Sequence, residues 1–134
     1  MVEYTKDKLE SLGYKIENAK ITNVELTMAD HGCLTSFITL DGGGWGTNYG
    51  GYCLGHGYLG AENFNGNADS IEYIMRIMDV VGSDTFNGMV GKYVRVATKG
   101  WGDTVRIIGN VLEDRWFDAK SFFEDKEDKA NGVD

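Results

Sequence analysis

A glycine- and aromatic-rich segment at residues 41–60 constrains the fold more than any other part of the chain. Nine of the 19 glycines lie in these twenty residues. Glycine at this density disfavours a helix and weakens a strand, and it invites bulges and close backbone approach. Aromatic residues in the same segment favour a pleated surface. We therefore expect a distorted strand within Trp45–Leu54, followed by a loop at residues 61–68.

A period of two marks the chain before this segment. In the stretch Ile16–Met28, alternate residues from Thr22 onward are suited to one face of a half-buried strand. Cys33–Leu40 has the composition of a second strand, and the intervening Ala29–Gly32 supplies turn residues. The sequence predicts a β-hairpin here.

The clearest helical pattern covers Ser70–Val81. Asp69 and Glu72 have the spacing of a capping box, and Gly82 is suited to end the helix. The broad apolar stripe indicates burial against a sheet. The residues expected to face that sheet are Ile71, Ile74, Met75 and Met78, widened by Ile77 and Val81.

Two further strands and a helix are expected in the C-terminal half. Lys92–Thr98 and Thr104–Leu112 have the composition of a second hairpin, joined by residues 99–103. Asp118 is suited to cap a short amphipathic helix that reaches Glu127, with Phe122 and Phe123 packing inward.

The predicted order of elements is β-β-β-α-β-β-α. It indicates an α+β fold with a mostly antiparallel sheet packed by one central helix, and a short C-terminal helix. With 134 residues, one domain spanning 1–134 is expected. Residues 1–15 form a lead-in and residues 128–134 a frayed tail in this prediction.

The formal net charge of −8 restricts the classes of partner. The chain has 21 acidic and 13 basic side chains, with no cluster of Lys and Arg. Direct binding to nucleic acid is therefore disfavoured. An acidic surface suits either plain solubility or contact with a basic host protein that itself binds nucleic acid. No apolar run is long enough to span a bilayer, and the segment Met1–Tyr14 lacks the apolar region of a secretory signal. We expect no membrane association and a cytoplasmic location.

Glycine patterns in the segment do not predict a cofactor. Gly55–Gly60 matches the dinucleotide-binding pattern, but the next helix is expected only about ten residues later. Gly42–Gly46 could cradle an anion, yet it lacks the Lys-Ser/Thr ending of a P-loop. Glu113 and Asp114 are adjacent and expected to be solvated. We predict no cofactor, no catalytic residue and no enzymatic activity.

Aromatic residues beside the glycines are the predicted contact surface for a ligand or partner. They could offer a flat stacking surface for a base or ring. The alternative is a kinked strand whose aromatic side chains cover the edge of the core. The candidate binding residues are Trp45, Tyr49, Gly50, Gly51, Tyr52 and Tyr58.

Two cysteines and two histidines leave a metal site as an open alternative. Together His31, Cys33, Cys53 and His56 would provide a tetrahedral zinc set. Both cysteines lie in apolar strand patterns, however, where a free thiol behaves as a small hydrophobe. We expect reduced thiols facing the core, with neither a disulfide, a bound metal nor a Cys–His nucleophile.

Several short stretches, spread over residues 16–123, carry a resemblance as a set. They are Glu17–Ile21, Asp30–Gly32, Gly50–Leu54, Tyr73–Gly82, Gly91–Val96, Ile108–Asn110 and Asp114–Phe117. The set resembles a family of small uncharacterised accessory proteins encoded by bacteriophages and prophages. The resemblance implies an accessory role in a host cell, such as stoichiometric inhibition or modulation of a CRISPR effector or another defence protein. The alternative hypothesis is a module that sequesters a small ligand, including a signalling nucleotide.

Overall fold

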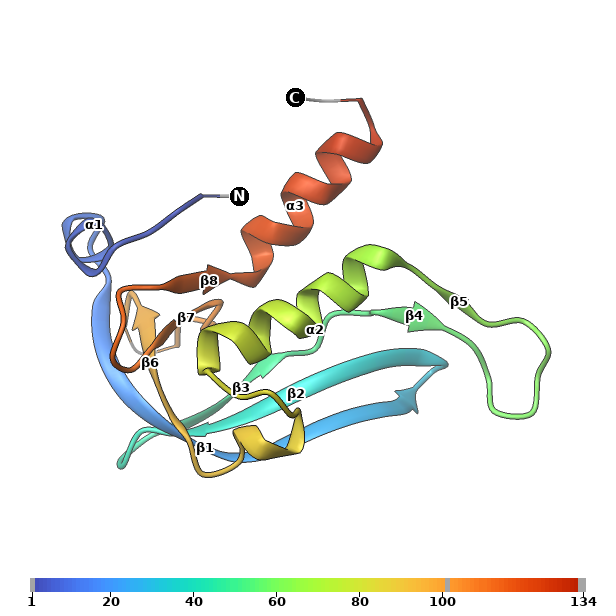
Figure 1. The fold of residues 1–134 in the computed structure, drawn as a ribbon, viewed down its shortest axis with the longest axis horizontal. Coiled ribbons are helices and arrows are strands. Elements are labelled where there is room, and N and C mark those ends of the chain that lie inside the picture. The colour runs from blue at the N-terminus through green and yellow to red at the C-terminus, as the bar shows by residue number, and fades with distance from the viewer. Residues whose placement is uncertain (1, 101, 133–134) are drawn as a thin grey trace.

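The structure is a computed structural model that describes residues 2–100 and 102–132. It is an α+β fold in which an antiparallel sheet curls beneath a central helix, as the sequence predicts (Figure 1). The sheet order is β5-β4-β2-β1-β6-β7-β8, and β3 pairs with β2 beside this path. The strands are β1 (Lys15–Asp30), β2 (Cys33–Asp41), β3 (Gly46–Gly50), β4 (Gly55–His56), β5 (Asn65–Gly66), β6 (Tyr93–Thr98), β7 (Ile107–Asn110) and β8 (Trp116–Asp118).

The long strand β1 pairs with different partners along its two halves. Residues 15–20 pair with β6, and residues 20–30 pair with β2. The register shifts between Ile21 and Asn23, and the backbone of Ile21 bonds to Lys92 and Gly91 just outside β6. Such an irregularity bends a strand and increases its twist. The β1–β2 hairpin consequently projects away from β6, β7 and β8, with β4 and β5 beside its tip (Figure 1).

The turn of this hairpin confirms the predicted use of Gly32. His31 and Gly32 both have positive φ, of 50° and 76°, and Asp30 pairs with Cys33 across the turn. Positive φ at both central residues matches the right-handed twist of the flanking strands. The positive φ of His31 was not expected from the sequence.

The central helix α2 spans Ala68–Val81 and begins differently from the prediction. Asn67, not Asp69, is the N-cap, and its side-chain oxygen accepts a hydrogen bond from the backbone of Ser70 at 2.9 Å. The predicted capping box of Asp69 and Glu72 is therefore wrong. Gly82 ends the helix with φ 85°, as expected.

The buried face of α2 is also rotated relative to the predicted stripe. Its fully buried apolar residues are Tyr73, Ile77, Val80 and Val81, and the helix packs against β7 and β8. Ile71 and Met75 are 62% and 57% exposed. The sequence did not identify the buried face, because apolar side chains cover most of the circumference of α2.

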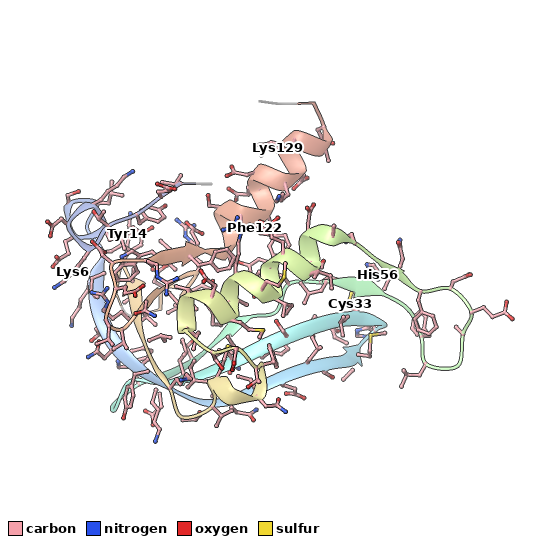
Figure 2. All side chains as sticks on the ribbon, viewed as in Figure 1. Lys6, Tyr14, Cys33, His56, Phe122 and Lys129 are labelled. Atoms are coloured by element: carbon pink, nitrogen blue, oxygen red, sulfur yellow. The ribbon has the colours of Figure 1, made fainter. Side chains whose placement is uncertain are left out.

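Helix α3 (Ala119–Ala130) packs beside α2 through aromatic side chains. Asp118 caps α3 by accepting a hydrogen bond from Ser121, as predicted. Phe122 faces α2 (Figure 2), and the helix continues through residues 128–130, which were expected to fray. The aromatic cluster has ring centroids 4.9–5.9 Å apart and comprises Tyr52, Tyr73, Phe117, Phe122 and Phe123.

Short elements complete the structure. Helix α1 (Lys6–Ser11) lies in the predicted lead-in and buries Leu9 against Ala97 and Ile107. A 3-10 helix, η1 (Asn87–Met89), follows α2. Strands β4, β5 and β8 were not predicted, and the residue Trp101 of the predicted connection lies outside the described residues. Among the helices described, none combines the length and apolar character that a bilayer crossing requires.

Replacing Gly50 with Ala should destabilise the fold. Gly50 has φ 116°, and a Cβ there would overlap the backbone oxygen of Ser36. We expect a loss in unfolding free energy of at least about 1–2 kcal/mol, measured by urea denaturation. Gly44→Ala is the matched control, because its Cβ would meet open space. Equal stability of the two variants would contradict the structure at β3.

Candidate functional site

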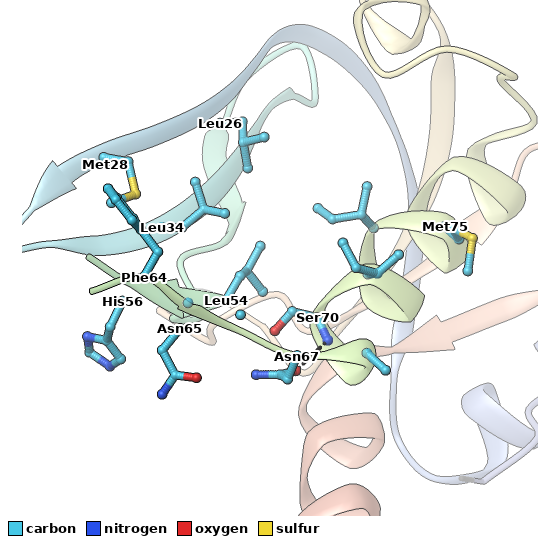
Figure 3. Close-up of a pocket in the computed structure, with 15 residues that line it drawn as sticks. Leu26, Met28, Leu34, Leu54, His56, Phe64, Asn65, Asn67, Ser70 and Met75 are labelled. Carbon is cyan, nitrogen blue, oxygen red and sulfur yellow. Dashed lines mark hydrogen bonds between the residues drawn. The ribbon is translucent and has the colours of Figure 1, made fainter. Parts of the chain in front are cut away.

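An apolar groove lies between α2 and the projecting end of the sheet (Figure 3). Its volume is about 590 Å³. Leu26 and Met28 line it from β1, and Leu34 lines it from β2. The opposite wall comes from α2, and one end is closed by the chain around β5. The lining residues from these two parts include Phe64, Asn65, Asn67, Ser70, Ile71, Ile74 and Met75.

The groove is formed by side chains that alternate regularly along β1. Val24, Leu26 and Met28 share a face, because successive side chains of a strand point to opposite sides. Val24 packs against the main core, but Leu26 is 52% exposed. The same face of β1 therefore packs in the core at Val24 and lines the groove at Leu26 and Met28.

Exposed apolar side chains gather around this groove rather than lying scattered. Phe64 is 61% exposed, which is similar to Ile71 and Met75 across the hollow. Single exposed apolar residues are normal on protein surfaces, whereas a contiguous patch indicates an interaction site. The signal in the sequence was the width of the apolar stripe on α2, which exceeds what one buried face requires.

The lining of the groove offers little chemistry. No Asp, Glu, Lys or Arg of the described chain lines it, and the ring of the lining residue His56 is turned away from the hollow (Figure 3). The side-chain oxygen of Asn67 already accepts a hydrogen bond from Ser70. The groove can therefore hold apolar groups, but it has no carboxylate or amine for general acid–base catalysis.

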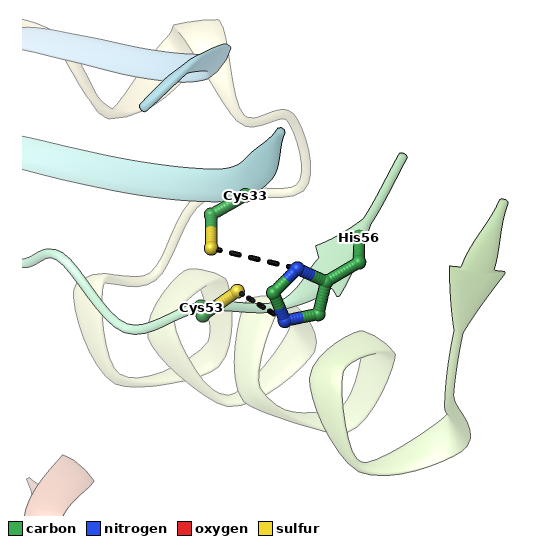
Figure 4. Close-up of side chains that lie close together, drawn as sticks. All are labelled: Cys33, Cys53 and His56. Atoms are coloured by element: carbon green, nitrogen blue, oxygen red, sulfur yellow. Dashed lines mark hydrogen bonds between the residues drawn. The ribbon is translucent and has the colours of Figure 1, made fainter. Parts of the chain in front are cut away.

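Cys33, Cys53 and His56 form a second feature, the Cys–His cluster, beside the groove (Figures 2 and 4). Their ligand atoms all lie within 4.8 Å of one another. The Sγ of Cys33 is 3.7 Å from Nδ1 of His56, and the Sγ of Cys53 is 3.5 Å from Nε2. The His56 ring points away from the groove (Figure 3).

Strand pairing brings these three residues together. Cys33 lies opposite His56 in the β2–β4 ladder, and Cys53 lies two residues before Gly55, where β4 begins. Cys33 is half-buried and Cys53 is exposed, so the prediction that both thiols face the core is wrong. His31 does not join the cluster. It is exposed, and its Nδ1 lies 2.9 Å from a carboxylate oxygen of Asp30.

The state of the Cys33 thiol argues against a nucleophile. Its hydrogen bond with the Cys53 thiol, its desolvation and the nearby Asp30 together raise the pKa of Cys33 to about 11. An activated cysteine requires the opposite shift. In addition, none of the described carboxylates hydrogen-bonds to His56 to orient it as a base.

The six residues predicted to bind a ligand or partner do not form one surface. Tyr49 is only 1% exposed, and its hydroxyl donates a hydrogen bond to the backbone of Arg106. Burial raises its pKa well above the usual value. Tyr52 is half-buried against Phe123 and Tyr73. These two tyrosines belong to the core and its edge, which corrects the expectation of a flat stacking surface.

The other four predicted residues lie apart. Gly50 and Gly51 have positive φ beside β2, and Gly51 donates a backbone hydrogen bond to Ser36. Tyr58 is exposed in the loop after β4. Trp45 is half-buried and lines a separate hollow of about 690 Å³ together with Lys15 and Asp103, among others. A binding role for these four residues stays a prediction.

Neither glycine pattern provides a phosphate site. Gly55–Gly60 leads into a loop rather than a helix, because α2 begins only at Ala68. In the Gly42–Gly46 pattern, the backbone N–H of Gly43 donates a hydrogen bond to the Asp41 carboxylate at 2.8 Å. A carboxylate of the chain itself therefore takes the N–H group that would bind an anion.

The adjacent Glu113 and Asp114 have structural contacts. Asp114 accepts hydrogen bonds from the Trp116 indole and from the backbone of Lys6, which lower its pKa. Glu113 pairs with Arg115. A paired carboxylate with a lowered pKa is unsuited to act as a general acid, so this pair offers no catalytic couple.

No protein-family model, curated protein sequence or solved structure matches this chain. The resemblance to phage-encoded accessory proteins therefore stays a prediction. Function must be argued from the apolar groove and the Cys–His cluster.

Polar substitution in the groove should leave stability unchanged. In the double variant Ile71→Gln/Met75→Gln, both side chains are already largely exposed. We expect a change in unfolding free energy within about 0.5 kcal/mol per site. The control Ile77→Ala removes a fully buried side chain on the same helix and should cost about 2–5 kcal/mol. Urea denaturation measures both, and a large loss in the double variant would show that this face is part of the core.

Proposed function

We propose that this protein acts by binding a partner protein, whose apolar side chains occupy the groove between α2 and the β1–β2 hairpin. The observation that carries this proposal is the gathering of exposed apolar residues around one hollow whose lining, within the described chain, includes no Asp, Glu, Lys or Arg. Aromatic and Met side chains are enriched where protein interfaces are most strongly packed. Phe64 and Met75 provide both types at opposite walls.

The charge of the chain supports a basic partner. The net charge is −8, and the exposed Asp30 and Glu62 lie two residues along the chain from the lining residues Met28 and Phe64. Acidic groups around an apolar contact favour a partner with basic residues around its apolar anchor, because opposite potentials speed encounter and fix orientation. Proteins that bind nucleic acids have such basic surfaces.

We extend the proposal to the biological role that the sequence suggests. A small acidic binding protein that resembles phage accessory proteins is suited to inhibit or modulate a host defence protein, such as a CRISPR effector, by stoichiometric binding. The groove would bind apolar side chains of the defence protein, and the acidic surface would compete with nucleic acid for the basic residues of that protein. This role requires no catalytic residue in the chain.

The proposal is tested by capture of a protein from a bacterial lysate. The wild-type chain should retain a protein that the Ile71→Gln/Met75→Gln variant retains at least about tenfold less well, because loss of two central anchors weakens an interface by more than 1.4 kcal/mol. Leu112→Gln is the matched control, since Leu112 is exposed and lies outside the groove.

Salt dependence tests the electrostatic part of the same interaction. Capture should weaken when ionic strength rises from about 0.05 to 0.5 M, because salt screens exposed charges. Equal capture by the wild type and the groove variant would contradict the proposal. Capture that does not respond to salt would be consistent with apolar binding in the groove, but it would contradict competition with nucleic acid through the acidic surface.

Sequestering of a small ligand is the second candidate function. Its supporting observation is the hollow beside Trp45, whose volume of about 690 Å³ lies in the range of ligand pockets and whose lining includes Lys15 and Thr98. A nucleotide that binds there should raise the unfolding temperature of the wild type but not of Trp45→Ala. A nucleotide screen without any such shift would exclude this candidate.

A further inference from the structure

We propose that Cys33, Cys53 and His56 bind a zinc ion through two sulfur atoms and one imidazole nitrogen, with one coordination position open to solvent. This site is distinct from the proposed partner binding, because Leu34 and Gly55 line the groove, whereas their neighbours Cys33 and His56 pair on the opposite face of the β2–β4 ladder. Of the three cluster residues, only His56 also touches the lining of the groove. The sequence left a zinc set of His31, Cys33, Cys53 and His56 as an open alternative and favoured thiols that face the core. Strand pairing connects three of them.

The spacing of the three side chains suits a tetrahedral ion. With zinc–sulfur and zinc–nitrogen bonds near 2.3 and 2.0 Å, neighbouring ligand atoms lie about 3.5–3.8 Å apart. The two measured sulfur–nitrogen distances are 3.7 and 3.5 Å. They involve different nitrogens of the His56 ring, whereas one nitrogen would bind the ion. One ligand nitrogen of the exposed His56 already lies within 4.8 Å of both sulfurs, so the ion requires only a small inward shift of these side chains.

The ligand types select the class of metal. Thiolate and imidazole ligands favour zinc and other soft or borderline ions, whereas magnesium and calcium require oxygen ligands. No carboxylate is part of the cluster as described. On binding, each thiol transfers its proton to solvent. One Zn²⁺ ion and two thiolates then form a group with no net charge, and two protons are released. No oxidant or reductant is consumed.

A metal at this position would strengthen a weak part of the sheet. β4 and β5 contribute only two residues each, and β4 pairs with β2 through two residue pairs. Backbone hydrogen bonds from Leu54 to Leu34 and from Gly57 to Gly32 add to this ladder. A zinc ion would join β2 to residues in and just before β4. Because the ion binds the folded chain, it should raise the unfolding temperature.

Cobalt titration of reduced, chelator-treated protein tests the site directly. We expect one Co²⁺ per chain, with the thiolate charge-transfer absorption and the intense visible bands of tetrahedral coordination, and displacement by Zn²⁺. Cys33→Ser, Cys53→Ser and His56→Gln should each weaken binding more than about tenfold, since even groups that only orient a ligand contribute that much. Cys53 and His56 are exposed, so these two variants should fold.

His31→Gln is the matched control, because His31 lies only two residues from Cys33 but outside the cluster. Its cobalt spectrum and zinc-dependent rise in unfolding temperature should equal those of the wild type. A cobalt complex without thiolate absorption would overturn the proposal, as would unchanged affinity in the His56→Gln variant.

Thiol oxidation provides an independent readout. Zinc should protect both cysteines, so that a thiol reagent still titrates two thiols after exposure to air. Equally fast loss of both thiols with and without zinc would show that the cysteines form a disulfide pair instead, and would also overturn the proposal.

Discussion

The structure depends on the change of partner along β1. A strand that kept the same neighbours over its whole length would lack the bend and added twist that the irregularity near Ile21 introduces. Because β1 leaves β6 at the bulge near Ile21 and continues with β2 alone, the hairpin extends beyond the helix. The apolar alternation of β1 continues across this point. Side chains that belong to the core before the bulge therefore line an open groove after it.

Local signals in the sequence predicted the elements whose cause is local. The period of two predicted β1 and β2, Gly82 predicted the end of α2, and Asp118 predicted the start of α3. Ile77 and Val81 of the predicted stripe are buried, but the full orientation of α2 could not be predicted, because apolar residues cover most of its circumference and only tertiary packing selects Tyr73 and Val80. The two-residue strands β4 and β5 arise from long-range pairing, and their sequences have no alternation to detect.

The same distinction applies to the candidate sites. The sequence contains the four Cys and His side chains, but the β2–β4 register decides that Cys33 meets His56 and that His31 turns toward Asp30. The predicted aromatic surface was incorrect for a related reason. Tyr49 alternates into the core within β3, whereas Trp45 precedes that strand. A glycine-rich segment conceals such alternation, because few side chains remain to reveal it.

The narrow wall formed by β4 and β5 gives the groove a mechanical property. Few backbone hydrogen bonds hold this wall, and the loop between its strands carries exposed Tyr58, Leu59 and Phe64. Segments with few buried contacts open at a lower free energy than the core to which they are attached. The wall should therefore open at a lower free energy than the helix and hairpin beside it, and each opening would change the width of the groove.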